Sequence, residues 1–279
     1  MDIFSRTPPP ADHRLPYGPD PLQFGDLRLS AAKHGELLPV VVFIHGGWWQ
    51  SAYDLEYGGH LCAALKSAGV ATWSLEYRRV GNPGGGWPGT MQDVAAGFDH
   101  LQTLAQAYPL DLYRVIAMGH SAGGELAFWL AGRHHIPPNS PLHYPQPIVP
   151  LAGVIALAGA VDLRLTIDLG GTFRFTSGKP AVLSLIGGTP KEFDDRCQAA
   201  NPGELLPLSV PQLLFQGSND NQIPPTLPDR WAENARRQGD QATVTIIPGA
   251  DHFDVVDPDS KAWPVIQSAI LHSLASSKT

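Results

Sequence analysis

The sequence predicts an α/β fold with a mostly parallel central sheet, helices on both faces, and a cap or lid insertion. Six short runs are apolar or β-branched with little alternation, which is typical of strands covered on both faces: residues 40–44, 70–75, 114–118, 154–157, 212–215 and 243–247. Segments with helical apolar spacing lie between several of them. This succession of strands and helices indicates a parallel sheet.

Length and composition restrict the classes of protein that this chain can belong to. Its 279 residues suit one domain, and the 43% hydrophobic content is enough for a large core. The net charge of −7 and the lack of a basic stripe exclude a nucleic-acid partner. No apolar run is long enough to span a membrane, so we expect no transmembrane segment.

The remaining elements follow in chain order. Residues 1–23 contain six prolines and are expected to be an extended arm without a regular element, followed by a single domain over 24–279. A short strand is expected over 24–29. The apolar spacing over 91–105 predicts a helix, with Thr90 and Asp93 as its capping box. A second apolar stripe, over 263–274, predicts a helix near the C-terminus. Residues 162–211 lack a clear strand and are expected to form the lid or cap.

Two features bear on the cellular compartment. Cys62 and Cys197 lie far apart in the sequence and are expected to be free and buried thiols. The first residues lack a basic segment followed by an apolar one, which is the pattern of a signal peptide. These features predict a cytoplasmic enzyme.

A G-x-S-x-G motif runs from Gly119 to Gly123, between a predicted strand and a predicted helix. A nucleophilic serine has to stand on a sharp strand-to-helix turn, where glycines prevent clashes and the helix dipole is favourable. The alternative is a glycine-rich turn that carries an idle serine. The flanking strand and helix favour Ser121 as the nucleophile.

The segment His45-Gly46-Gly47-Trp48-Trp49 follows another predicted strand. Acyl transfer places negative charge on the carbonyl oxygen of the substrate, and preorganised N–H donors stabilise it. Glycines let the backbone turn its amides inward. The expected donors are the amides of Gly47, Trp48 and Ala122. His45 is expected to brace the loop by hydrogen bonds rather than to transfer protons.

The acid and the base are expected after the last two strands. Asp220 follows the run at 212–215, and His252 follows the run at 243–247. The order Ser, Asp, His along the chain is the one that α/β-hydrolases use. Asp220 has a local alternative as a turn former, and Asp251, Asp254 and Asp257 are rival acids.

Together these motifs resemble the esterase and kynurenine-formamidase-like branch of the α/β-hydrolases, which adjoins the hormone-sensitive-lipase-like esterases. The resemblance extends over roughly residues 24–275 and includes Glu76-Tyr77-Arg78 and Gly124. The hormone-sensitive-lipase-like group usually has a third glycine at Trp48 and an acidic residue at His120. Both departures place the chain closer to the formamidase-like and small carboxylesterase side. The pair Tyr77-Arg78 is expected to be structural.

The predicted substrate pocket includes Trp49, Trp87 and His120. Of the adjacent Trp48 and Trp49, one is expected to pack and the other to form a pocket wall, and the loop carrying Trp87 is expected near the pocket mouth. No dinucleotide fingerprint follows a strand, and adjacent histidines such as His134 and His135 diverge on a helix. We therefore expect no cofactor and no metal.

The predicted function is hydrolysis of small carboxylic esters through an acyl-enzyme. An arylformamidase acting on N-formylkynurenine would use the same mechanism, and the sequence does not separate the two. A non-catalytic binding protein on the same fold is a more distant alternative. The expected partner is a small ester or formamide, and the sequence does not predict an oligomeric state.

Overall fold

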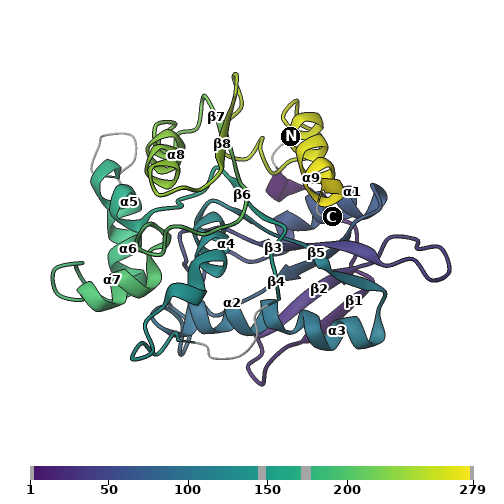
Figure 1. The fold of residues 1–279 in the computed structure, drawn as a ribbon, viewed down its shortest axis with the longest axis horizontal. Coiled ribbons are helices and arrows are strands. Elements are labelled where there is room, and N and C mark those ends of the chain that lie inside the picture. Colours follow the sequence, from purple (N-terminus) through teal and green to yellow (C-terminus); the bar gives the residue numbers. More distant parts are fainter. Residues whose placement is uncertain (1–2, 144–148, 171–176, 277–279) are drawn as a thin grey trace.

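The structure, a computed structural model, describes residues 3–143, 149–170 and 177–276. Within these ranges the chain forms an eight-stranded sheet in the order β1-β2-β4-β3-β5-β6-β7-β8 (Figure 1). Strands β3 to β8 run parallel to one another. At one edge of the sheet, β2 pairs antiparallel with both β4 and β1. The strands are β1 His13–Pro16, β2 Phe24–Arg28, β3 Leu38–Ile44, β4 Ala71–Leu75, β5 Leu110–His120, β6 Gly153–Leu157, β7 Gln212–Gly217 and β8 Ala242–Ile247.

Helices cover both faces of the sheet, because alternate side chains of each central strand enter different cores. In β3, Val40, Val42 and Ile44 join one core, while Val41 and Phe43 join the other. The second core is covered by α1 (Gly59–Ser67) and α9 (Trp263–Ser276). The first is covered by α2 Gly89–Asp99, α3 Leu101–Ala107, α4 Ala122–Gly132 and α8 Leu227–Arg237. The predicted fold class is thereby confirmed.

The segment 162–211 is helical where the structure describes it. It contains α5 Leu163–Leu169, α6 Gly178–Ile186, α7 Asp194–Ala200 and the 3₁₀ turn η4 Pro202–Glu204. These helices lie together beyond α8, at the left of Figure 1. Apolar side chains of α6, such as Val182 and Leu185, join the first core. The segment is therefore a packed helical insertion, and its role as a lid stays a prediction.

Three sequence-based expectations were wrong. The arm over 1–23 contains a 3₁₀ turn, η1 (Ile3–Ser5), and the edge strand β1, whose pairing with β2 overrides its proline content. The capping box is absent from α2, which begins after Pro88 without a side-chain cap. Thr90 instead donates to the carbonyl of Arg78, and Asp93 accepts from Arg78 and Gln23, so tertiary contacts occupy both side chains. The predicted helix also breaks at His100 into α2 and α3.

Cys62 and Cys197 are free and buried, as expected. Within the described residues, no helix is both long and apolar enough to cross a bilayer.

Candidate active site

Ser121 stands at the turn between β5 and α4, with φ 55° and ψ −121°. Such a conformation is unfavourable for a residue with a side chain and persists only where the surroundings hold it. Backbone bonds do so here: the Ser121 amide donates to Leu157 (2.9 Å), and its carbonyl accepts from Gly124 and Ala160 (both 3.0 Å). The turn is also tight, since a Cβ on Gly119 would lie 1.9 Å from the carbonyl oxygen of Gly123. This geometry is the one that a nucleophile elbow requires.

His252 follows β8 and is almost completely buried. Its Nδ1 lies 2.7 Å from Oδ2 of Asp220, which follows β7. Ser121 and His252 line the same small cavity, with a volume of about 30 Å³. Three residues separated by many positions in the sequence are thus brought to one end of the sheet.

Asp220 is held in its ionised form. Burial opposes ionisation, but the hydrogen bond and charge of His252 and the amides of Ile223 and Gln222 hold the pKa of Asp220 below its usual value. The Gln222 and Ile223 amides donate to Oδ1 at 2.7 and 2.9 Å. Because an ionised carboxylate only accepts, Nδ1 of His252 carries the proton. In the neutral imidazole, Nε2 is then the basic nitrogen.

The His45–Trp49 loop follows β3 and has an unusual backbone. Gly47 has φ 111°, and Trp48 and Trp49 have φ 52° and 56°. A side chain on Gly47 would collide with Tyr53, whose Cβ would lie 2.4 Å from the added atom. The elbow, with Ala122 as the first residue of α4, lies beside this loop.

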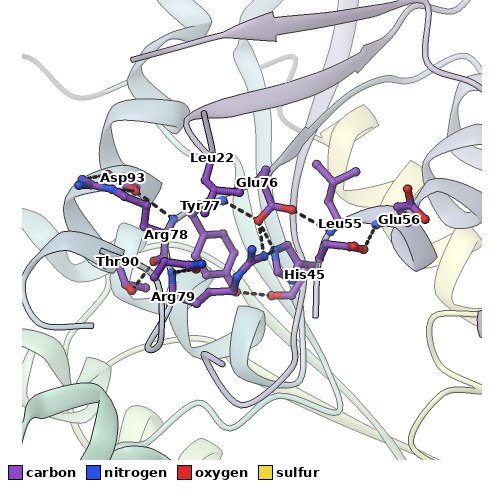
Figure 2. Close-up of polar contacts among 12 residues, drawn as sticks. Leu22, His45, Leu55, Glu56, Glu76, Tyr77, Arg78, Arg79, Thr90 and Asp93 are labelled. Atoms are coloured by element: carbon purple, nitrogen blue, oxygen red, sulfur yellow. Dashed lines mark hydrogen bonds and ion pairs between the residues drawn. The ribbon is translucent and has the colours of Figure 1, made fainter. Parts of the chain in front are cut away.

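A buried polar network holds the start of this loop (Figure 2). The Tyr77 hydroxyl donates to the His45 carbonyl at 2.8 Å, and the two rings stack with centroids 4.5 Å apart. Arg79 donates to His45 Nε2 at 3.1 Å and pairs with Glu76. Glu76 also lies 3.3 Å from Nε2 of His45. Because a carbonyl oxygen only accepts, Nδ1 of His45 donates to the Gly46 carbonyl at 2.8 Å. His45 therefore braces the loop, as expected from the sequence.

The cavity at Ser121 and His252 has aromatic walls from distant parts of the chain. Besides the predicted Gly47, Trp48 and His120, it is lined by Phe4, Tyr53, Tyr57, Gln222 and Phe253. Sequence reasoning missed these five residues. Four of them carried a positional signal: Phe253 is next to His252, Gln222 is two residues after Asp220, and Tyr53 and Tyr57 follow shortly after the His45–Trp49 loop. Phe4 carried none, because the arm reaches the site through tertiary packing.

Two residues assigned to the pocket from the sequence lie elsewhere. Trp49 is fully buried in the first core, and its indole N–H donates to Glu125 at 3.0 Å. The turn at Trp48 and Trp49 directs the first side chain to the cavity and the second inward. Trp87 is half-buried beside α6, with its amide donating to Leu185 at 2.8 Å, and it is not among the described residues that line the cavity.

Comparison with known proteins gives similar chains at low identity. The isoprenylcysteine alpha-carbonyl methylesterase ICME of Arabidopsis thaliana is 25% identical over 86% of this chain and 56% of its own length. The esterase LipC of Mycobacterium tuberculosis is 26% identical over 88% of this chain and 60% of its own length. The chain thus spans little more than half the length of these curated relatives.

Solved structures agree in fold. Esterase B from Lactobacillus Rhamnosis superposes with a TM-score of 0.82 at 20% identity, covering 99% of this chain and 89% of that chain. A truncated carbohydrate esterase from gut microbiota gives a TM-score of 0.78 at 18% identity, covering 97% of this chain and all of that one. The family model described as BD-FAE matches residues 26–233. This match extends over most of the sheet and includes the elbow, so the chain belongs to the BD-FAE family and has the α/β-hydrolase fold.

Proposed function

We propose that the chain is a serine carboxylesterase that cleaves small esters through an acyl-enzyme, with Ser121, His252 and Asp220 as its triad. The observation that carries the proposal is the arrangement at the cavity. An elbow serine shares it with a buried imidazole, whose other nitrogen is held by an ionised carboxylate. The names of the relatives, a methylesterase and an esterase, support ester hydrolysis.

In the proposed first half-reaction, Nε2 of His252 takes the proton of the Ser121 hydroxyl as the oxygen attacks the ester carbonyl. Asp220 stabilises the imidazolium that forms and fixes its orientation. The negative charge on the carbonyl oxygen is stabilised by the amides of Gly47, Trp48 and Ala122. His252 then protonates the departing alcohol, which leaves the acyl group on Ser121.

In the second half-reaction, His252 removes a proton from water as the water attacks the acyl-enzyme. His252 then returns this proton to the Ser121 oxygen, which leaves as the acid is released. The small volume beside Ser121, about 30 Å³, favours a short acyl group. A larger cavity of about 570 Å³ adjoins it and shares Phe4, Tyr53 and Tyr57 as walls. We assign this outer cavity to the larger part of the substrate.

The proposal is tested with p-nitrophenyl acetate. The wild type should release p-nitrophenol and react with a fluorophosphonate probe, whereas Ser121→Ala should lose both activities. Ser67→Ala is the matched control, because Ser67 is an exposed serine on α1 that only donates to the Ala63 carbonyl. Near-wild-type turnover by Ser121→Ala would contradict the proposal. The formamidase alternative predicts a higher specificity constant for N-formylkynurenine than for any small ester.

A further inference from the structure

Tyr57 and His120 connect three parts of the proposed active site: the His45–Trp49 loop, the elbow at Ser121 and the segment that carries His252. The Gly46 amide donates to the Tyr57 hydroxyl at 2.6 Å, and this hydroxyl lies 2.8 Å from Nδ1 of His120. Nε2 of His120 lies 2.9 Å from the backbone carbonyl oxygen of His252. Tyr57 and His120 are 5% and 1% exposed, so water does not compete for these bonds. This series of hydrogen bonds therefore joins the His45–Trp49 loop to the backbone of His252.

The proton positions in this series follow from the partners. A carbonyl oxygen only accepts, so Nε2 of His120 must carry a proton. Burial and the neighbouring His252 lower the pKa of His120 to about 3, so the ring is neutral at pH 7. Nδ1 is then an acceptor, and the Tyr57 hydroxyl donates to it while accepting from Gly46. Each of the two side chains uses one donor and one acceptor in the series.

We propose that Tyr57 and His120 are positioning residues, which fix the oxyanion donors relative to the imidazole of His252. The inference rests on the proposed function. The Gly46 amide belongs to the residue before the expected donor Gly47, so its orientation constrains the next peptide. His120 precedes the nucleophile, and its bond to the His252 carbonyl holds the backbone of the base. The rings of His120 and His252 also lie 4.7 Å apart, which requires His120 to be neutral when His252 becomes charged.

The effect should fall on kcat. The charge on the carbonyl oxygen develops only in the transition state, so a displaced donor weakens transition-state binding and leaves ground-state binding nearly unchanged. Tyr57→Phe removes the hydroxyl and keeps the ring, which packs against Phe4 and Phe253. We expect kcat for p-nitrophenyl acetate to fall by about 10- to 100-fold, with KM changed less than about twofold.

Tyr17→Phe is the matched control. It removes another largely buried tyrosine hydroxyl, which donates to the Glu76 carbonyl at 2.6 Å and does not line the cavity at Ser121. Both variants lose one buried hydroxyl, so thermal unfolding should report similar stability losses. Only Tyr57→Phe should lose turnover. Equal kcat values in the two variants, or a loss in Tyr57→Phe that appears only as a higher KM, would overturn the proposal.

A second measurement tests the proton positions in the wild-type protein. Nitrogen NMR of histidine-labelled protein at pH 7 should show His120 as the neutral tautomer with the proton on Nε2, assigned by comparison with His120→Gln. A protonated His120, or the Nδ1–H tautomer, would overturn the proposal. If wild type and Tyr17→Phe hydrolyse no ester, the proposed function fails. If they do and Tyr57→Phe matches them, only this inference fails.

Discussion

Ser121, Asp220 and His252 project from the end of the sheet, whereas Phe4 and Tyr53 come from segments outside it. The first three are 3%, 5% and 3% exposed, and the latter two are 48% and 42% exposed. The residues of the proposed triad are held by backbone bonds and by each other, whereas Phe4 and Arg6, at the start of the arm, contact the rest of the protein through their side chains. Arg6 pairs with Asp257 and Asp259, and Phe4 packs against Tyr57 and Phe253. The proposed triad is therefore built on the buried core, whereas the exposed walls of the cavity are more easily changed.

The largest expected effect tests the acid. Asp220→Asn keeps the shape, but its amide can donate to Nδ1 of His252 and then favours the tautomer with the proton on Nε2. Because that tautomer cannot accept the Ser121 proton, we expect kcat to fall by about 10⁴-fold, as in other triads. Steady-state kinetics with p-nitrophenyl acetate measures this.

The control is Asp251→Asn, at an exposed rival carboxylate that accepts from the amides of Phe253 and Asp254. It should keep most of the activity. A larger loss in Asp251→Asn than in Asp220→Asn would transfer the acid role to Asp251.

The next prediction compares two adjacent residues, Trp49 in the first core and Trp48 in the wall of the cavity. Trp49→Ala should lower the free energy of unfolding by about 3–5 kcal/mol, because it empties a fully buried site and leaves Glu125 without its indole donor. Trp48→Ala should cost less stability and raise KM, since Trp48 lines the cavity and donates to Gln222 at 3.4 Å. Urea unfolding and steady-state kinetics of both variants check this. The reverse assignment of the two losses would contradict the structure.

Glu125 gives a smaller effect, with a distinct pH dependence. Burial, only partly offset by the Trp49 donor, raises the pKa of Glu125 well above its usual value. Above the pKa of the unfolded state, the folded protein binds more protons than the unfolded one, so stability falls as pH rises toward the folded pKa. Glu125→Gln should remove this slope, which is at most about 1.4 kcal/mol per pH unit.

Urea unfolding of wild type and Glu125→Gln between pH 5 and pH 9 measures the difference in slope. At the low end of this range Glu125 is protonated in the folded state and, like glutamine, carries no charge. The difference in free energy of unfolding between wild type and variant should therefore be smallest there. Parallel stability curves over the whole range would show that Glu125 is ionised in the folded protein.

The same contrast between core and wall explains what the sequence could predict. The strands, the elbow and the order of Ser121, Asp220 and His252 follow from local patterns, because apolar runs and glycine turns have the same meaning wherever they occur. Asp220 contacts Nδ1 of His252, and its role as the acid stays a proposal. The roles of Trp48 and Trp49 depend on two residues with positive φ, which no sequence pattern specifies.

The contacts of the arm are harder still to predict. Phe4 meets Phe253 across almost the whole length of the chain, with ring centroids 5.0 Å apart. Such a contact depends on how the finished fold places both segments. Tyr57 and His120 are similar, since their bond joins the 3₁₀ turn η2 (Glu56–Gly58) to the end of β5, and these segments are far apart in the sequence. The sequence therefore indicates the residues of the proposed triad more directly than the walls of the cavity.

The smallest expected effect is at the wall itself. Phe4 lines both the inner and the outer cavity and touches none of the reacting atoms in the proposed mechanism. Phe4→Ala should raise KM for p-nitrophenyl acetate by about three- to tenfold, which corresponds to about 1 kcal/mol of lost apolar contact, and leave kcat nearly unchanged. For methyl acetate, whose alcohol is too small to fill the outer cavity, KM should change less. Tyr113→Ala, at an aromatic residue that is 83% exposed on β5, is the control. Equal changes for the aryl and methyl esters would show that the arm does not discriminate between leaving groups, and a loss of kcat would place Phe4 with the core residues in this comparison.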